Sequence, residues 1–267
     1  MTSRTGKLAK SPLAHVIASV RFAPWPRLAK HIDEIQDDLR EIAPLMNVVQ
    51  LEQVGPDGQA VGAPRQSWVL VASDNSFSIQ FTQDQVLVHS YKYDVYSDFE
   101  AILEKSLSTL LRYMKFIDVL TMGVRYIDHV KPASGESISS YVSEKLLVPS
   151  FAGHKSIGGQ AVYEYKAAND VRLRVNALSL PGSPRLSQDV WGVVAMDSQP
   201  PGNLKIELLG ENELTLDMDA ILALPSPQRC TLKDIMEKVD GLHAIANGFF
   251  RQEDVFTDYA FEVWRGE

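Results

Sequence analysis

The sequence has little cysteine and no long apolar run. Cys230 is the single cysteine among 267 residues. One thiol cannot form an internal disulfide, which is typical of proteins from a reducing compartment. No segment approaches the roughly 18 consecutive apolar residues of a membrane helix. Residues 1–10 are polar and basic, without the apolar stretch of a secretory signal. These absences predict a cytoplasmic protein with no membrane segment.

Positive charge is scarce as well. The 26 Lys and Arg residues against 34 Asp and Glu residues give a formal net charge of −8. Proteins gain most of their affinity for nucleic acid by neutralising phosphates, so this balance argues against nucleic acid as a partner while allowing a local basic patch. The hydrophobic share of 45% and the charged share of 22% are typical of a globular domain.

Catalytic and metal-binding motifs are missing. None of the six histidines has a second His or Cys at metal-ligand spacing. Asp128 and His129 are adjacent, but neighbouring residues on a strand face opposite sides, which argues against a catalytic dyad. The Gly-rich segment 153–159 lacks the spacing of a P-loop. Cys230 precedes a predicted helix cap at Thr231, and the sequence places no base beside it. No metal, cofactor or catalytic residue is predicted.

What the sequence does contain is strand and helix periodicity. Alternation of apolar and polar residues predicts strands at 15–22, 47–54, 67–72, 77–82, 86–93, 119–130, 161–166, 171–178, 191–197, 203–209 and 213–218. Apolar residues three and four apart predict helices at 27–42, 97–114, 136–146 and 231–264. Capping boxes are predicted at Ser97–Glu100 and Thr231–Asp234. This order predicts an α+β fold, an antiparallel sheet with helices on one face.

The order of elements repeats along the chain. Residues 18–22 (ASVRF) align with residues 122–126 (MGVRY), and each segment is followed by a helix, strands and a capped helix. We interpret this as a tandem duplication with a flexible tail at 1–14, a first repeat at 15–118 and a second repeat at 119–267 that ends in a long helical region. The element order is similar to that of duplicated saddle-like folds such as the TATA-binding-protein fold, a likeness that implies no function.

A short motif carries a family resemblance. The segment 124–128 (VRYID), together with Pro12-Leu13 leading into residues 20–22 (VRF), resembles a sporadically distributed prokaryotic family of uncharacterised proteins of similar length. That family commonly has Asn where this chain has Asp128. The resemblance covers nearly the whole chain through short motifs, and it implies no activity and no catalytic residues. The scattered distribution of the family points to accessory genes, such as those of defence or toxin–antitoxin systems.

Strand alternation also predicts a polar face opposite the helices. The residues expected on that face as a ligand-binding site are Arg21, Arg125, Arg172, Arg174, His89 and Tyr91. The arginine fork suits phosphate or carboxylate, so an anionic small molecule or a protein partner is expected there. The competing interpretation is that the arginines pair with Glu52, Glu164, Asp128 or Asp197 as ordinary solvated sheet residues. The aromatic run 91–96 suits base stacking or anchoring of a core, and the acidic balance favours anchoring.

The sequence therefore favours a non-catalytic binding or regulatory protein that holds an anionic ligand or partner on an arginine-bearing face. One alternative is an enzyme acting on a phosphorylated or nucleotide-like substrate, with His89 or His129 as the acid–base group. The second alternative is a subunit of a defence or toxin–antitoxin complex. The oligomeric state stays open.

Overall fold

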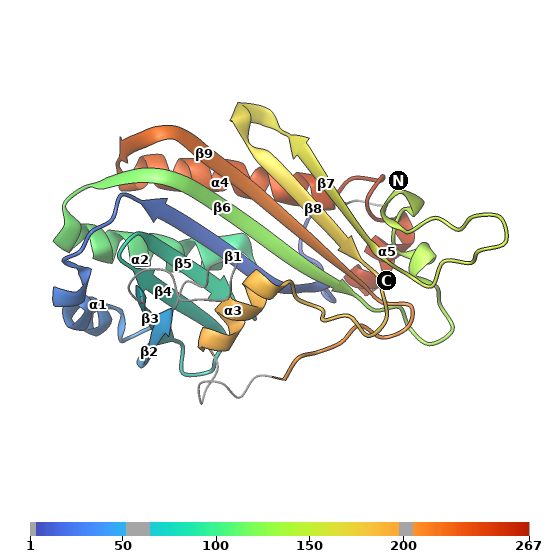
Figure 1. Ribbon diagram of the computed structural model, residues 1–267, viewed down its shortest axis with the longest axis horizontal. Coiled ribbons are helices and arrows are strands. Elements are labelled where there is room, and N and C mark those ends of the chain that lie inside the picture. Colours follow the sequence, from blue (N-terminus) through green and yellow to red (C-terminus); the bar gives the residue numbers. More distant parts are fainter. Residues whose placement is uncertain (1–3, 52–64, 198–204, 267) are drawn as a thin grey trace, which may run out of the picture.

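One antiparallel sheet organises the molecule. The computed structural model describes residues 4–51, 65–197 and 205–266. Nine strands follow the order β2-β3-β4-β5-β1-β6-β9-β8-β7 (Figure 1). Their bounds are β1 (Leu13–Phe22), β2 (Leu45–Leu51), β3 (Arg65–Val71), β4 (Phe77–Thr82), β5 (Gln85–Ser90), β6 (Ile117–Val130), β7 (Gln160–Lys166), β8 (Arg172–Leu178) and β9 (Leu214–Cys230). The predicted α+β class is confirmed.

The helices vary in length and position. Their bounds are α1 (Ile32–Leu39), α2 (Tyr96–Met114), α3 (Gln188–Asp197), α4 (Leu232–Phe250) and α5 (Asp258–Arg265). α2 packs on β5, α4 packs on β6 and β9, and α1 packs on α2. α4 begins at the predicted capping box, in which the Thr231 hydroxyl accepts from the backbone N–H of Asp234. None of the described helices is both long enough and apolar enough to cross a membrane.

The main core lies between these helices and the sheet. On β1 the alternate residues Val16, Ala18 and Val20 are fully buried on this side, as strand alternation predicts. α4 contributes Ile235, Val239 and Leu242, with further buried residues at the same spacing, so its apolar stripe faces the sheet. Burial of this stripe is the main reason that the helix holds its place.

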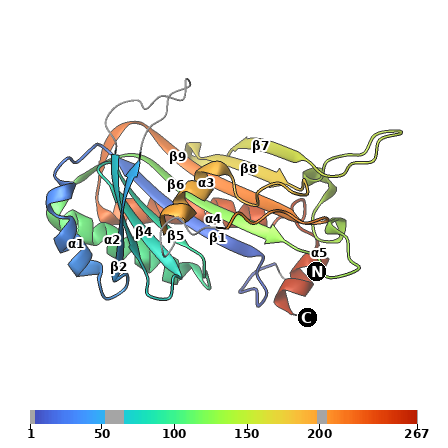
Figure 2. The same cartoon turned by 60° about the horizontal axis from the view of Figure 1, so that its bottom comes forward.

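The prediction that all helices lie on one face is wrong. Figure 1 shows α3 in front of the sheet and α4 behind it, and Figure 2 shows α3 lying across the strands. A second, smaller core joins Val190 and Val194 of α3 to apolar residues of the reverse face, Ile17, Leu87 and Ile127. The segment 191–197 was predicted as a strand. It is helical because this conformation sets Val190 and Val194, four residues apart, on the same side against the sheet.

Other predicted elements also differ. Residues 205–209 form no strand, and the helix predicted at 231–264 is two helices, α4 and α5. The helix at 136–146 is two short 3-10 turns, Ile138–Ser140 and Glu144–Leu146. The box at Ser97 does not cap α2, which begins one residue earlier after Val95 without a side-chain cap. The second strand of the predicted hairpin at 203–218 is part of the 17-residue β9. Residues 203–204 and the end of the predicted strand at 47–54 lie outside the described residues.

The two matched sequence segments lie side by side at the centre of the sheet. β1 and β6 pair antiparallel, with Ala18 opposite Val124. Outward from this pair the strands follow in the order β5, β4, β3, β2 on one side and β9, β8, β7 on the other. This strand order does not by itself show a duplication, so the tandem repeat and its boundaries stay a prediction.

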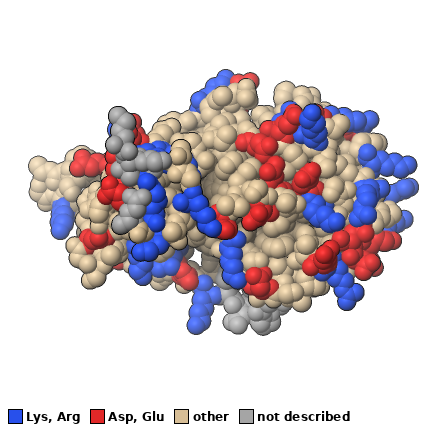
Figure 3. Space-filling view, turned by 180° about the vertical axis from the view of Figure 1, so that it is seen from behind, with Lys and Arg blue, Asp and Glu red and all other residues tan. Residues whose placement is uncertain are grey.

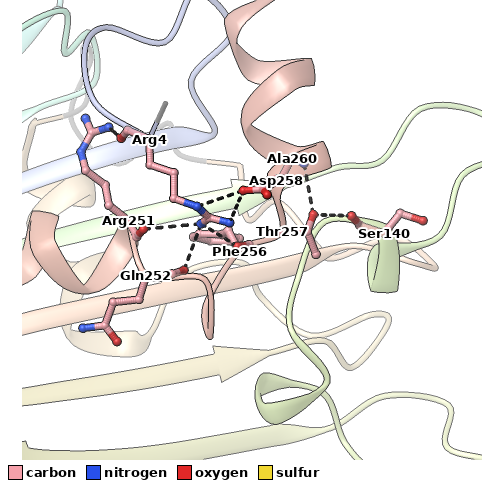
Figure 4. Close-up of polar contacts among 8 residues, drawn as sticks. All are labelled: Arg4, Ser140, Arg251, Gln252, Phe256, Thr257, Asp258 and Ala260. Atoms are coloured by element: carbon pink, nitrogen blue, oxygen red, sulfur yellow. Dashed lines mark hydrogen bonds and ion pairs between the residues drawn. The ribbon is translucent and has the colours of Figure 1, made fainter. Parts of the chain in front are cut away.

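The N-terminal segment packs against the C-terminal helices. Figure 4 shows the Arg4 guanidinium, which donates to the Asp258 carboxylate at 2.7 Å and to the backbone oxygens of Phe256 and Gln252 at 2.8 and 3.2 Å. The backbone N–H of Lys10 donates to the backbone oxygen of Trp264. In the predicted tail at 1–14, residues 4–12 are therefore held against α5 and the end of α4, and Leu13 and Ala14 belong to β1.

Candidate functional site

The predicted site residues do share one face of the sheet. His89 on β5 and Arg125 on β6 both pair with Ile17, one on each side of β1. On the far side of β9, Arg174 lies opposite Asp219, which itself pairs with Arg125. α3 covers part of this face, so it is not the helix-free surface that the sequence predicted.

Arg125 is already bound to carboxylates. Its Nε and Nη2 donate to the two Asp217 oxygens at 2.7 and 2.6 Å, and its Nη1 donates to Asp189 at 2.6 Å. Nη2 also donates to the Ser187 hydroxyl at 2.9 Å. The side chain is 16% exposed. These partners lock Arg125 to β9 and to the start of α3, leaving little of its fork for a ligand.

The other three arginines lie apart from this cluster. Arg21 Nη2 lies 3.4 Å from Asp84 Oδ2, and Arg172 Nη1 lies 3.7 Å from Glu164 Oε2. Arg172 and Arg174 are exposed on β8, near the edge of the sheet. Figure 3 shows the other side of the molecule, that of α4, where acidic and basic side chains are interspersed. The interpretation of paired sheet arginines fits Arg21, Arg125 and Arg172, and the four arginines do not form one anion-binding surface.

His89 and Tyr91 meet in a buried polar cluster under the end of α3. The Asp197 carboxylate accepts from His89 Nδ1 at 2.7 Å and from the Tyr91 hydroxyl at 3.2 Å. Its other oxygen accepts from Gln80 Nε2 at 2.8 Å. The His89 side chain is 0% exposed and that of Asp197 is 1% exposed. Burial and the charge of Asp197 raise the pKa of the Tyr91 hydroxyl, so it stays a donor.

His15 extends this cluster toward a cavity. Its Nδ1 lies 3.0 Å from His89 Nε2. When the His89 ring is neutral, its Nδ1–H donates to Asp197 and its Nε2 accepts from Nδ1–H of His15. Nε2 of His15 then keeps a lone pair that has no partner among the described residues. Burial, together with the nearby His89, lowers the pKa of His15 to about 3, so its ring is neutral at physiological pH. We call Asp197, His89 and His15 the relay.

The relay ends at a cavity of about 240 Å³, which we call the relay cavity. It is lined by Ala14, His15, Tyr91, Ile127, His129, Arg185, Leu186, Trp191, Val194, Lys205, Glu207 and Thr215. Apolar walls with a few converging polar groups are typical of a site for a small molecule.

The opposite wall of the relay cavity carries a second set of polar groups. His129 Nε2 lies 3.1 Å from a Glu213 oxygen, to which Arg185 Nη2 donates at 3.3 Å. Burial and then the charge of Arg185 lower the pKa of His129. Arg185 Nε and Thr215 Oγ1 are buried without a hydrogen-bond partner among the residues that the structure describes. Buried groups of this kind need an explanation, and a ligand in the cavity supplies one.

Two other sequence interpretations are settled by the same geometry. Asp128 points to the helix-covered side of the sheet and His129 to the relay cavity, so the two form no dyad. Cys230 is buried, and burial raises the pKa of its thiol, which is the opposite of what a reactive thiolate needs. Within the described ranges, no group of three or more His, Cys, Asp or Glu side chains is placed to hold a metal.

Sequence reasoning missed His15, Asp197 and Arg185. Asp197 was placed in a strand, and neither His15 nor Arg185 has a nearby partner in the sequence. Asp197 meets His89 across 108 positions, a separation at which spacing gives no signal.

Comparison with known proteins gives this site no name. No family model matches the sequence, and no curated protein matches it. The chemistry of the relay cavity is therefore the basis on which a function can be argued.

Proposed function

We propose that the chain binds a small anionic molecule in the relay cavity and acts on it by acid–base chemistry, with His15 as the base. The observation that carries this proposal is the buried relay, Asp197 to His89 to His15, which ends on a cavity. A base that is oriented by a second group, itself held by a carboxylate, is the arrangement of many catalytic sites.

The relay can support a proton transfer. When Nε2 of His15 takes a proton from a bound molecule, the ring becomes an imidazolium. Burial and the neighbouring His89 disfavour this positive charge and lower the pKa of His15 to about 3, and the hydrogen bond to His89, with the carboxylate of Asp197 behind it, offsets part of that cost. The proton stays on Nε2 until it is returned to the leaving group or to water. No other group has to change its charge.

Unused donors define the class of ligand. Arg185 Nε and the Thr215 hydroxyl are buried and unpartnered among the described residues, although Nη1 and Nη2 of Arg185 donate to Glu207 and Glu213. Lys205 lines the same cavity. These donors suit an acceptor-rich group such as a phosphate ester or a carboxylate. The ligand class is thus the one expected from the sequence, at a different place from the arginine-bearing face.

The test is a panel of phosphate monoesters, nucleotides and small carboxylates, measured by calorimetry for binding and by product analysis for turnover. A member of the panel should bind and be converted. His15→Gln should keep binding and lose about 10²–10⁴-fold in rate, the usual contribution of a general base. His154→Gln is the control, because His154 is exposed on a distant loop.

The outcomes separate the candidate functions. Binding without turnover would leave the non-catalytic binding protein favoured by the sequence, now with the relay cavity as its site. Absence of binding across the panel would reject both. A subunit of a defence or toxin–antitoxin complex also stays a prediction, which affinity capture from the native host tests.

We also propose the tandem duplication behind this fold. The antiparallel β1–β6 pair and the outward strand order on each side of it support two related halves. Separate expression of residues 15–118 and 119–267 would test the boundaries, with cooperative unfolding of each half as the expected result.

A further inference from the structure

A second cavity lies on the other side of the sheet, under the N-terminal segment. It has a volume of about 280 Å³ and is bounded by α4, β6 and residues 6–13. We propose that this second cavity binds a small zwitterion, a molecule with both an ammonium and a carboxylate group, such as a free amino acid. The proposal does not depend on the relay cavity.

Asp128 is the anionic half of the second cavity. The residue is 2% exposed, and its Oδ2 is buried with no hydrogen-bond partner in the part of the chain that the structure describes. No described Lys, Arg or His lies within ion-pair distance of it. Burial, reinforced by the charge of Asp217, raises the pKa of Asp128 well above its ordinary value and favours the neutral carboxyl while no ligand is bound. A ligand ammonium would supply the missing hydrogen-bond donor and the positive charge that makes Asp128 the anionic half of the occupied cavity.

Arg251 is the cationic half. Its Nε donates to Asn247 Oδ1 at 3.0 Å and its Nη2 to the backbone oxygen of Gly6 at 3.1 Å, while Nη1 donates to the backbone oxygen of Arg4. All three acceptors are uncharged. Over the described ranges no carboxylate forms an ion pair with Arg251, and burial lowers the pKa of its guanidinium. A ligand carboxylate would supply its counter-charge.

Asp128 and Arg251 together decide the class of ligand. An amine without a carboxylate would gain from Asp128 and be repelled by Arg251, whereas an acid without an amine would gain from Arg251 and leave Asp128 neutral, without the contact of an ammonium group. A zwitterion matches both groups and adds no net charge to a buried site.

The remaining walls suit such a molecule. Tyr93, Tyr126 and Phe250 line the cavity with aromatic rings, which attract a cationic group through their faces. Tyr126 and His243 are bound to each other at 2.6 Å, and burial lowers the pKa of His243 to about 4, so it adds no positive charge. The other charged groups at the cavity, Lys7 and Asp94, form an ion pair with each other.

The N-terminal segment closes the second cavity from outside. Gly6, Leu8 and Leu13 form part of the wall. Arg4 holds this segment in place through Asp258 (Figure 4). The ring of Phe261 also contributes, since its centre lies 4.7 Å from the Arg4 guanidinium carbon. Arg251 also donates hydrogen bonds to the backbone of this segment. The residue that would bind the ligand carboxylate therefore also helps to enclose the cavity.

The test is calorimetric titration of the intact chain with free α- and ω-amino acids and two matched derivatives of each. The methyl ester lacks the carboxylate, and the N-acetyl form lacks the ammonium. At least one free amino acid should bind, and both of its derivatives should bind about tenfold more weakly or worse, since each loses one charge-assisted contact.

Variants provide the second arm. Asp128→Asn keeps the shape of the side chain and should weaken binding by about tenfold or more. Asp74→Asn removes an exposed carboxylate that pairs with Lys92 and does not line this cavity, and should leave affinity unchanged. His15→Gln should also bind like the unsubstituted chain, which separates this site from the relay cavity. Thermal midpoints verify that each variant is folded.

Three results would overturn the proposal. These are no binding of any free amino acid, equal binding of a free amino acid and either derivative, and unchanged affinity of a folded Asp128→Asn variant.

Discussion

His89 Nδ1 lies 2.7 Å from the Asp197 carboxylate, and both side chains are closed to solvent. This pair joins a central strand to the last residue of α3, the helix that covers the reverse face of the sheet. The same contact fixes the ring of His89 so that its second nitrogen meets His15. The His89–Asp197 hydrogen bond therefore both holds α3 against the sheet and forms part of the proposed catalytic relay.

Removal of the Asp197 carboxylate should destabilise the fold. We expect Asp197→Ala to lower the free energy of unfolding by about 3 kcal/mol, because buried donors of His89, Tyr91 and Gln80 lose their acceptor. Urea denaturation measures the change. The control is Asp74→Ala, which removes an exposed carboxylate and should unfold like the parent chain. Equal midpoints for the two variants would show that the relay does not anchor α3.

Replacing Arg125 by alanine should destabilise the fold far more than replacing Arg21 by alanine. Arg125→Ala leaves the buried Asp217 carboxylate without its cation, and we expect a loss of about 3 kcal/mol in the free energy of unfolding. Arg21→Ala removes an exposed ion pair, and its denaturation midpoint should barely move. Comparable small effects at both positions would instead mean that Arg125 is free to bind a ligand, as the sequence suggested.

His15 should make stability depend on pH. Its pKa is about 3 in the folded protein and near 6.5 in the unfolded chain, so between these values only the unfolded chain binds the proton. The contribution of His15 is complete above about pH 6.5 and is lost as the pH falls toward 3. His15→Gln should therefore lose less stability than the parent between neutral and acidic pH. Thermal midpoints across that range test the difference, and parallel curves would contradict it.

Asp219 should make stability fall as the pH rises, whereas His15 makes it fall as the pH drops. Burial, opposed by Arg125 and reinforced by Asp217, raises the pKa of Asp219 to about 6. Ionisation of this carboxyl costs stability as the pH rises from about 4 to above 6. Asp219→Asn keeps the shape without the charge, so its thermal midpoint should exceed that of the parent at about pH 8 and approach it at about pH 4. A lower midpoint at the higher pH would show that the ionised group is stabilising.

Elements with strong local signals were predicted from the sequence. Residues 15–22 alternate between two faces, and the structure buries Val16 and Ala18 under the helices and Ile17 under α3. Thr231 and Asp234 form a capping box whose partners lie within one turn, so α4 could be placed at its first residue.

Elements with weak periodicity were not predicted correctly from the sequence. The run at 191–197 is apolar on several sides and fits a short strand as well as a buried helix. Contact with Ile17 and Ile127 on the reverse face decides between them, and those residues lie far away in the sequence. The predicted helix at 136–146 has helical spacing but forms only short turns.

The sequence by itself determined the α+β class and the face on which Arg125 and His89 lie, because side-chain direction along a strand is a local property. Tertiary structure alone decided that Arg125 would be neutralised by Asp217 and that His89 would join Asp197 to His15. It also decided that Asp128 would lie beside a cavity without a hydrogen-bond partner for its Oδ2 among the described residues. Those contacts depend on the order and register of strands that are distant along the chain, which local periodicity does not encode.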